Sequence, residues 1–255
     1  MRNPLLRLFG PFASLFFPSH CIACGIQGPG ICAKCIREIP FAEKAERADI
    51  YAVYDYGNRI VQKAIHDAKY YRKSEGLLAL VRASAPVIAE HLAEKLLLSH
   101  SQKILFVPVP QHIRKTRARG FNQSALIARA LCRSIEEGIV RNLLVKSRAT
   151  VPQAHTRNKK ARLENLVGSM HSTTSLSKER LYVVIDDVTT TGATCIEAIR
   201  ALKANGAVSD KDILNGLFQL GGGLLRRVGD DAVEDLATDV EDRADRVEAH
   251  VRPPS

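Results

Sequence analysis

The sequence predicts an α/β domain built around a mostly parallel sheet, with a small cysteine-bearing module in front of it. Short apolar runs that end at Pro or Asp alternate with longer segments whose apolar residues recur every three or four positions. Such alternation of strands and helices is typical of parallel sheets covered by helices. At 255 residues the chain is long enough for one domain with its own core and one or two small additions.

The composition is that of an ordinary globular protein, with 45% hydrophobic residues, 25% charged residues and no Trp. The net charge of +10 is spread unevenly along the chain. Residues 208–255 contain 6 basic and 11 acidic residues, whereas the preceding residues contain 31 basic and 16 acidic ones. A body this basic favours an anionic partner, either a polyphosphate ligand or nucleic acid.

Residues 1–45 are expected to form a separate module that begins with an apolar run, Leu8 to Phe17. This run is short, is broken by Gly10-Pro11, and is followed by no small-x-small cleavage site. We expect it to dock on the body of the protein, with a signal peptide as the less favoured alternative. No stretch is long enough to predict a membrane span. Four of the six cysteines crowd into one segment, which favours a reducing cytoplasm over a secreted, disulfide-bonded domain.

That segment contains two Cys-x-x-Cys pairs separated by seven residues: Cys21, Cys24, Cys32 and Cys35. Each pair lets two thiolates converge from one tight turn, and four protein ligands are typical of a closed, structural zinc site. The sequence therefore predicts bound Zn²⁺, with the adjacent His20 as an alternative ligand. A redox role for the two pairs is a second interpretation, although no thioredoxin-like context surrounds them.

A second domain is expected over residues 50–207, after a polar connector. Strands are predicted at short apolar runs that Pro, Asp or polar residues bound: 50–56, 103–107, 143–145 and 181–185. Helices are predicted where apolar residues recur at three and four: 61–71, 76–98, 121–137 and 193–203. Two basic stretches, residues 114–119 and 147–162, are predicted to be loops.

Residues 208–255 form a divergent acidic tail that we expect to be partly disordered. Its first part is polar where a last strand of the sheet is expected. Ile213 to Leu220 either supplies that strand or follows a change of reading frame.

The clearest functional signal is the segment Tyr182–Thr194, YVVIDDVTTTGAT. An apolar strand delivers Asp186 and Asp187 at its carboxyl end, where α/β sheets place ligands. Two adjacent carboxylates need partners, and the hydroxyls of a vicinal diol can donate to them. The following loop and helix start offer hydroxyl and backbone N–H groups to a phosphate: Thr189, Thr190, Thr191, Gly192, Ala193 and Thr194.

A diol followed by a phosphate describes a ribose 5-phosphate. The alternative is a buried strand whose Asp pair caps a helix. Capping needs only one carboxylate and leaves the threonines unexplained.

Taken with three further patterns, this segment resembles the ComF family, also called ComFC or competence protein F, of the type I phosphoribosyltransferase superfamily. The further patterns are the two Cys-x-x-Cys pairs, Pro108-Val109-Pro110 followed by Arg117 to Ser124, and Pro152-Gln153 with Arg162 and Asn165. Together they cover about residues 14–206.

The resemblance implies a Rossmann-like core of about five mainly parallel strands with an added hood. It also implies binding of phosphoribosyl pyrophosphate (PRPP) together with Mg²⁺. A phosphoribosyltransferase would join ribose 5-phosphate to a nitrogen acceptor and release pyrophosphate, with Asp186 and Asp187 in the catalytic position. Arg117 and Arg119 would then hold pyrophosphate oxygens, and Lys69 lies near a lysine of the family. An exposed basic loop without a ligand is the alternative for the two arginines.

The resemblance also implies a second, non-enzymatic function, which the first does not exclude. This is a competence or DNA-uptake factor that binds single-stranded DNA and competence or recombination proteins. The basic body fits both functions, because phosphate contacts dominate nucleic-acid affinity too. Candidates for stacking on bases have no sequence pattern that groups them: Tyr54, Tyr56, Tyr70 and Tyr71.

Overall fold

The computed structural model describes residues 19–28, 30–42, 52–99, 103–136, 138–146, 168–177, 179–187, 193–205 and 213–214. The helices in them are α3 (Ala33–Arg37), α4 (Arg59–Tyr70), α5 (Glu75–Ser99), α6 (Ile113–Arg119), α7 (Gln123–Cys132) and α9 (Ala193–Lys203). The strands are β1 (Lys103–Pro108), β2 (Gly138–Val140), β3 (Leu144–Lys146), β4 (Met170–Ser172), β5 (Arg180–Ile185) and β6 (Ile213–Leu214).

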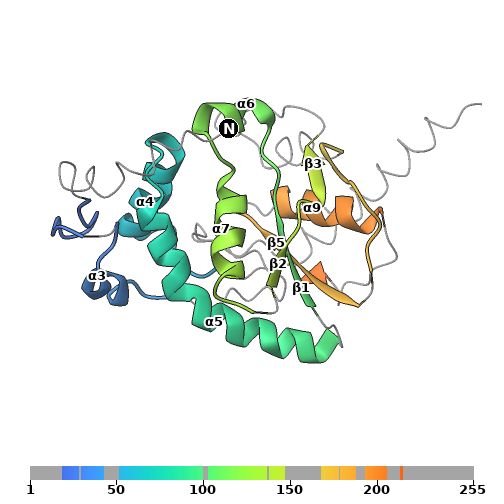
Figure 1. The fold of residues 1–255 in the computed structure, drawn as a ribbon, viewed down its shortest axis with the longest axis horizontal. Coiled ribbons are helices and arrows are strands. Elements are labelled where there is room, and N and C mark those ends of the chain that lie inside the picture. The colour runs from blue at the N-terminus through green and yellow to red at the C-terminus, as the bar shows by residue number, and fades with distance from the viewer. Residues whose placement is uncertain are drawn as a thin grey trace, which may run out of the picture.

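A four-stranded sheet in the order β2-β1-β5-β6 lies at the centre of this architecture (Figure 1). All three pairings are parallel, and β1 pairs with β5 from Lys103 opposite Arg180 to Pro108 opposite Ile185. Parallel neighbours require crossover connections, which α6 with α7 and α9 supply. The predicted α/β class with a parallel sheet is therefore confirmed. The described residues contain four of the roughly five strands that the family resemblance implies.

The two central strands separate two apolar cores. Side chains alternate along a strand, so Phe106 of β1 packs in the core with α4, α5 and α7, whereas Val107 packs in the core with α9. Figure 1 shows α5 and α7 on one side of the sheet and α9 on the other. Burial on both faces explains why β1 and β5, KILFVP and RLYVVI, are apolar at nearly every position.

Two packed helices connect the cysteine module to the sheet. Asn58 caps α4 by accepting hydrogen bonds from Ile60 N and Val61 N. Gly30 of the module lies so close to the backbone of Gly76, at the start of α5, that any Cβ would collide with it. The module residues Ile31 and Ile39 are buried in the same core as both helices. The module is thus packed on the domain.

Within the described residues, α5 is the one helix long and apolar enough to cross a membrane. Its Leu77, Leu80, Ile88 and Leu92 side chains lie in the core beside α4 and α7. A core helix therefore accounts for its apolar sequence.

Three predicted elements differ from the structure. The basic residues 114–119 belong to a helix, α6, because His112 Nδ1 accepts from Arg114 N and Gly120 ends the helix at φ 87°. Helix α7 ends at Cys132, well before residue 137, and β2 follows at Gly138. The predicted strand at 50–56 appears in its described part as bridges, one of which joins Phe41 to Tyr54.

The short strand predicted at 143–145 is confirmed as β3, which pairs antiparallel with an unpredicted strand, β4. In the tail, β6 pairs parallel with β5 through two residues, opposite Tyr182 and Val183. This pairing supports the reading in which the tail supplies a strand of the sheet. The other tail residues, 208–212 and 215–255, lie outside the described residues, as do the basic stretch 147–162 and Asn165.

Candidate functional site

The carboxyl ends of β1 and β5 meet at one edge of the sheet. Pro108 lies opposite Ile185, and Val109 N donates a hydrogen bond to Ile185 O at 2.9 Å. The chain that leaves β1 at Pro110 and the chain that leaves β5 at Asp186 therefore emerge side by side. This is the edge at which open α/β sheets bind ligands.

Asp186 and Asp187 are both buried at this edge, with 8% and 9% of their surface exposed. Asp186 Oδ1 accepts from Asp187 N at 2.8 Å and from Ser124 Oγ at 3.2 Å. Ser124 comes from the first turn of α7, whose cap residue Asn122 donates from Nδ2 to Val109 O at 2.9 Å. Helix α7 is thus tied to both strand ends.

Burial and, to a smaller extent, the negative charge of Asp187 raise the pKa of the Asp186 carboxyl to about 7. The Asp187 N–H, Lys69 and Ser124 oppose this rise without cancelling it. The site therefore concentrates negative charge in a place with little water. A cation or a hydrogen-bond donor from a ligand is favoured there.

Lys69 is the residue that the structure adds most firmly to this site. Its Nζ lies 2.9 Å from Asp187 Oδ2, and the two side chains are 20% and 12% exposed. The last turn of α4 delivers it, because Ala68 and Ile65 of the same helix are fully buried against the core. Lys69 was suggested only by the family resemblance, and the structure brings its Nζ into direct contact with Asp187.

The two predicted arginines differ in position. Arg119 is half-buried, and its Nη1 donates to Gln123 Oε1 at 3.4 Å. Gln123 in turn donates to Ile65 O at 3.5 Å, so Arg119 belongs to the junction between α7 and α4. Arg117 is exposed on α6. Arg119 therefore contacts the first turn of α7, the same turn that carries Ser124.

Lys146 is a charged residue of this region that sequence reasoning missed. Burial lowers the pKa of its ammonium group, and nearby Lys115 lowers it further. Asp186 and Glu197 act in the opposite direction, which shows that Lys146 lies within electrostatic reach of the strand-end carboxylate. It is the last residue of the short strand β3, where a single Lys gives no sequence signal.

Most of the predicted phosphate loop lies outside the described residues: Thr189, Thr190, Thr191 and Gly192. Ala193 begins α9, and Thr194 is half-buried in its first turn. On the β1 side, Gln111 Oε1 is buried and has no hydrogen-bond partner within the described part of the chain. A buried amide oxygen of this kind is a ready acceptor for a ligand hydroxyl.

A second site is the cysteine cluster of the N-terminal module. The Sγ atoms of its four cysteines lie within 4.8 Å of one another, and Cys24 Sγ is 3.8 Å from Cys32 Sγ. A tetrahedral site with Zn–S bonds of about 2.3 Å places neighbouring sulfurs about 3.8 Å apart. Gly25, at φ 73°, makes the turn that returns the chain after Cys24. The four thiols could therefore bind a metal such as zinc.

The thiols of this cluster are perturbed in opposite directions. Burial would raise the pKa of Cys21, but hydrogen bonds from the backbone of Cys24, Cys32 and Ala23 outweigh it and lower the pKa to about 6. Hydrogen bonds with Cys32 and Cys24 raise the pKa of Cys35 to about 12. Four thiolates cannot accumulate in such a small space without a cation, which is the condition that a bound metal satisfies.

The remaining cysteines and His20 stand apart from this cluster. Cys132 donates from Sγ to Gly138 O, and Cys195 is buried on α9. None of the six cysteines, all of which lie in the described part of the chain, forms a disulfide. His20 is exposed and forms a bridge with Gln27, and it is not among the clustered ligands.

The chain is similar to several bacterial proteins, although no family model matches it. It is 29% identical over 192 residues to the DNA utilization protein YhgH of Escherichia coli (strain K12), a match that covers 74% of this chain and 80% of that protein. The protein of the same name from Shigella flexneri matches to the same extent. The one from Salmonella typhimurium is 28% identical over 200 residues, covering 75% of this chain and 81% of that protein. The relatives of this chain are thus proteins named for the utilization of DNA.

Proposed function

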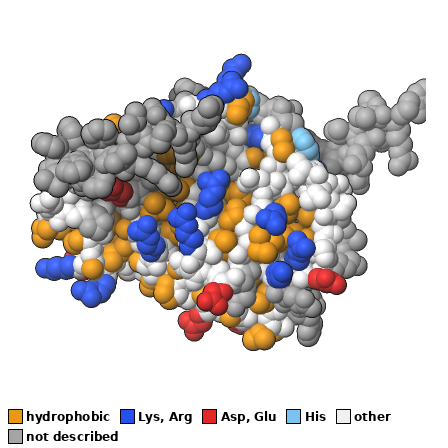
Figure 2. Space-filling view, viewed as in Figure 1, with side chains coloured by type: hydrophobic (Ala, Val, Ile, Leu, Met, Phe, Trp, Pro, Cys, Tyr) orange, Lys and Arg blue, Asp and Glu red, His pale blue; other side chains and the backbone are white. Residues whose placement is uncertain are grey.

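We propose that this chain is a ComF-type protein that serves the uptake or utilization of DNA and binds single-stranded DNA in that role. The observation that carries this proposal is the similarity, over 74% of the chain, to proteins named DNA utilization protein. Charge supports it, because the first 207 residues hold 31 basic and 16 acidic residues. On the face drawn in Figure 2, Lys and Arg side chains cross the middle and also lie at the lower left and the top, whereas the acidic side chains are fewer.

Oligonucleotide binding tests this proposal. Fluorescence anisotropy with a labelled oligothymidylate of about 15 nucleotides should show binding that weakens steeply with salt, with a slope of about −0.7 for each phosphate contacted. A matched double-stranded oligonucleotide is the comparison probe. Absence of binding to the single strand at low salt would contradict the proposal.

A second candidate function is the binding and turnover of PRPP at the strand-end site. The Lys69–Asp187 ion pair beside the buried Asp186, at the carboxyl end of β5, is the observation that favours it. Asp186 and Asp187 would accept hydrogen bonds from the ribose hydroxyls, and the loop from Thr189 to Thr194 would hold the 5-phosphate. Arg117 and Arg119 would hold the pyrophosphate.

In such a transfer, the bond from ribose C1 to the pyrophosphate oxygen breaks and its electron pair leaves with pyrophosphate. A bond from C1 to a nitrogen acceptor forms. Mg²⁺ supplies charge neutralisation on the pyrophosphate when it is bound. The chain's own residues would orient the ribose and hold the leaving group.

Calorimetric titration with PRPP and Mg²⁺ tests this second function. The wild type should bind PRPP, and the Asp186→Asn/Asp187→Asn variant should lose binding, because both ribose contacts are weakened. Ribose 5-phosphate serves as a weaker-binding control ligand. Pyrophosphate release with a panel of nucleobases and amines then separates turnover from binding. Equal PRPP affinity in the wild type and the double variant would overturn this site assignment.

We also propose that the cysteine cluster holds structural zinc. Elemental analysis of the purified protein should find about one zinc per chain, and Cys24→Ser should lower that ratio. Cys132→Ser is the matched control, because Cys132 lies outside the cluster. Zinc content near zero in the wild type would contradict the assignment.

A further inference from the structure

Three aromatic rings gather on the surface at the end of α4. The His66 and Tyr70 ring centroids are 4.6 Å apart with planes at 43°, and those of His66 and Tyr71 are 5.6 Å apart with planes at 57°. Tyr70 and Tyr71 are 64% and 63% exposed, and His66 is exposed as well. These rings therefore contribute little to the core, although large apolar rings are usually its main components.

The face of α4 opposite the ring cluster is packed into the core. Val61, Ala64, Ile65 and Ala68, on the opposite face of α4, are fully buried. Lys69, between the ring-bearing positions, is held by its ion pair with Asp187. A platform whose backbone is already ordered loses little conformational freedom when a ligand contacts it.

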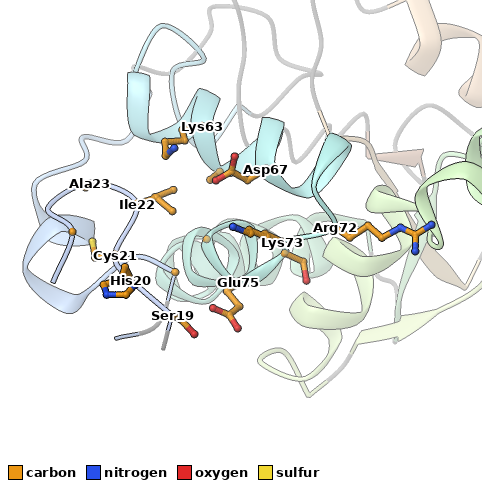
Figure 3. Close-up of a pocket in the computed structure, with 15 residues that line it drawn as sticks. Ser19, His20, Cys21, Ile22, Ala23, Lys63, Asp67, Arg72, Lys73 and Glu75 are labelled. Carbon is orange, nitrogen blue, oxygen red and sulfur yellow. The ribbon is translucent and has the colours of Figure 1, made fainter. Parts of the chain in front are cut away.

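Basic residues flank the cluster in the sequence, and three of them line a large cavity. A cavity of about 1070 Å³ opens between the cysteine module and the two helices α4 and α5. Its charged lining comprises three basic residues, Lys63, Arg72 and Lys73, and two acidic ones, Asp67 and Glu75. Figure 3 shows Lys63 and Asp67 of α4 at the upper side of this space and Lys73 below them, with Glu75 lower still.

The basic lining continues toward helix α6. In Figure 3 the Arg72 side chain points away from the cysteine module. Its guanidinium lies 3.9 Å from where a side chain at Gly120, the residue that ends α6, would begin. Arg72 itself sits at φ 58°, so the chain turns sharply there and presents neighbouring side chains in different directions. Arg72, the residue after Tyr71, thus reaches from the lining of this cavity to the end of α6.

We propose that His66, Tyr70 and Tyr71 form a platform on which bases of single-stranded DNA stack, while Lys63 and Lys73 contact its phosphates. This inference rests on the DNA-utilization function proposed above and names the surface that would carry it. Exposed aromatic rings beside basic groups are the combination by which proteins bind single strands without reading their sequence.

A protein partner suits this surface less well. The core of a protein–protein interface is depleted in Lys, whereas the rings here have Lys63, Lys69 and Lys73 near them in the sequence. Duplex DNA suits it less well too, because its bases are already stacked and present no free faces to the rings. Charge and ring exposure together therefore favour a single strand.

The test uses the full-length protein and the anisotropy assay with the oligothymidylate of about 15 nucleotides. The Tyr70→Ala/Tyr71→Ala variant should bind at least about tenfold more weakly, because each base that loses its ring loses its stacking energy. Tyr70→Phe/Tyr71→Phe keeps the rings and should bind within about twofold of the wild type. Leu97→Ala/Leu98→Ala is the matched control, since these side chains are also exposed but lie at the far end of α5.

An abasic oligomer of equal length separates stacking from phosphate contacts. The wild type should prefer the oligothymidylate to the abasic strand, and the double alanine variant should bind both equally. If the wild type binds the oligothymidylate and the alanine variant binds it equally well, the platform is wrong and the DNA function stands. If the wild type does not bind it at all, the proposed DNA function fails as well. Equal or tighter binding of the matched duplex by the wild type would also overturn the platform.

Discussion

Two groups of buried carboxylates lie close together in the sequence and differ in how fully the protein satisfies them. Glu197 on α9 is 3% exposed, and its Oε2 accepts from Arg200 Nε at 2.8 Å. Its Oε1 accepts from Arg200 Nη2 and from Met170 N, both at 3.1 Å. One negative charge thus faces a two-pronged guanidinium and a backbone donor, which is close to complete satisfaction.

The Asp186–Asp187 pair at the end of β5 is in the opposite situation. Two adjacent carboxylates are buried there, and among the described residues no cation contacts Asp186 directly. The pKa of Asp186 rises to about 7 as a result of burial and of its charged neighbour. Glu197 therefore joins α9 to β4, whereas Asp186 has no contacting cation among the described residues and keeps acceptor capacity for a ligand. The difference teaches that buried charge marks a binding site only where the protein leaves it incompletely paired.

The largest effect on stability is expected when the satisfied site is broken. Arg200→Met removes the guanidinium and leaves the Glu197 carboxylate buried without its cation. We expect the free energy of unfolding to fall by about 3 kcal/mol, measured by urea denaturation at pH 7. PRPP and oligonucleotide affinities should change little under conditions where the variant is folded.

Arg200→Lys is the control for this prediction. It keeps the charge but loses the two-pronged geometry, so its stability should fall between that of the wild type and that of Arg200→Met. A fully stable Arg200→Met variant would show that Glu197 is not held by this pair.

At the strand-end site, by contrast, we expect a substitution to raise the free energy of unfolding. Asp186→Asn removes a carboxylate that is costly to ionise but keeps an oxygen that can accept from Ser124 and from Asp187 N. We expect the free energy of unfolding at pH 7.5 to rise by about 1–2 kcal/mol, because sites built to bind ligands are seldom optimal for stability. The measurement is the same urea denaturation, repeated across pH.

The raised pKa of Asp186 determines the direction in which stability changes with pH. The pKa of Asp186 is raised in the folded chain from its ordinary value of 3.8 to about 7, so the folded state binds more protons than the unfolded state within that range. The contribution of Asp186 to stability is therefore fully present below about pH 4 and is lost as the pH rises through about 7. Asp186→Asn should flatten this part of the wild-type curve. Identical pH curves for the two proteins would contradict the raised pKa.

The strand-end carboxylates and the cysteine cluster could be predicted from the sequence, because the residues of each lie close together in the chain. The strand Leu181–Ile185 and the carboxylates after it are contiguous, so an apolar run followed by Asp186-Asp187 predicts both a buried strand and a ligand edge. The four cysteines are likewise grouped by short spacing, and the structure brings their sulfurs together as expected. Local patterns of this kind survive folding because neighbouring residues stay neighbours.

The rest depends on contacts between distant segments. Lys69 and Asp187 are 118 positions apart, and nothing local marks their ion pair. Glu197 resembles any polar residue of an amphipathic helix until Met170 and Arg200 are placed beside it. The tyrosines 70 and 71 showed no sequence pattern because their grouping depends on His66 and on the turn that ends α4. The helix α6 was missed because its arginines suggested a loop, whereas its caps, His112 and Gly120, decide its ends.

The smallest loss of stability is expected at Lys69, whose ion pair with Asp187 connects α4 to the strand-end site. Its ion pair with Asp187 is partly exposed, so Lys69→Gln should lower the free energy of unfolding by only about 1 kcal/mol. Lys63→Gln, at an exposed position of the same helix, should change it by less than about half of that. A double-mutant cycle of Lys69→Gln with Asp187→Asn isolates the pair, and the two substitutions should be less than additive because each removes the same contact. Strict additivity would mean that Lys69 and Asp187 act independently. It would contradict an ion pair that connects α4 to the strand-end site.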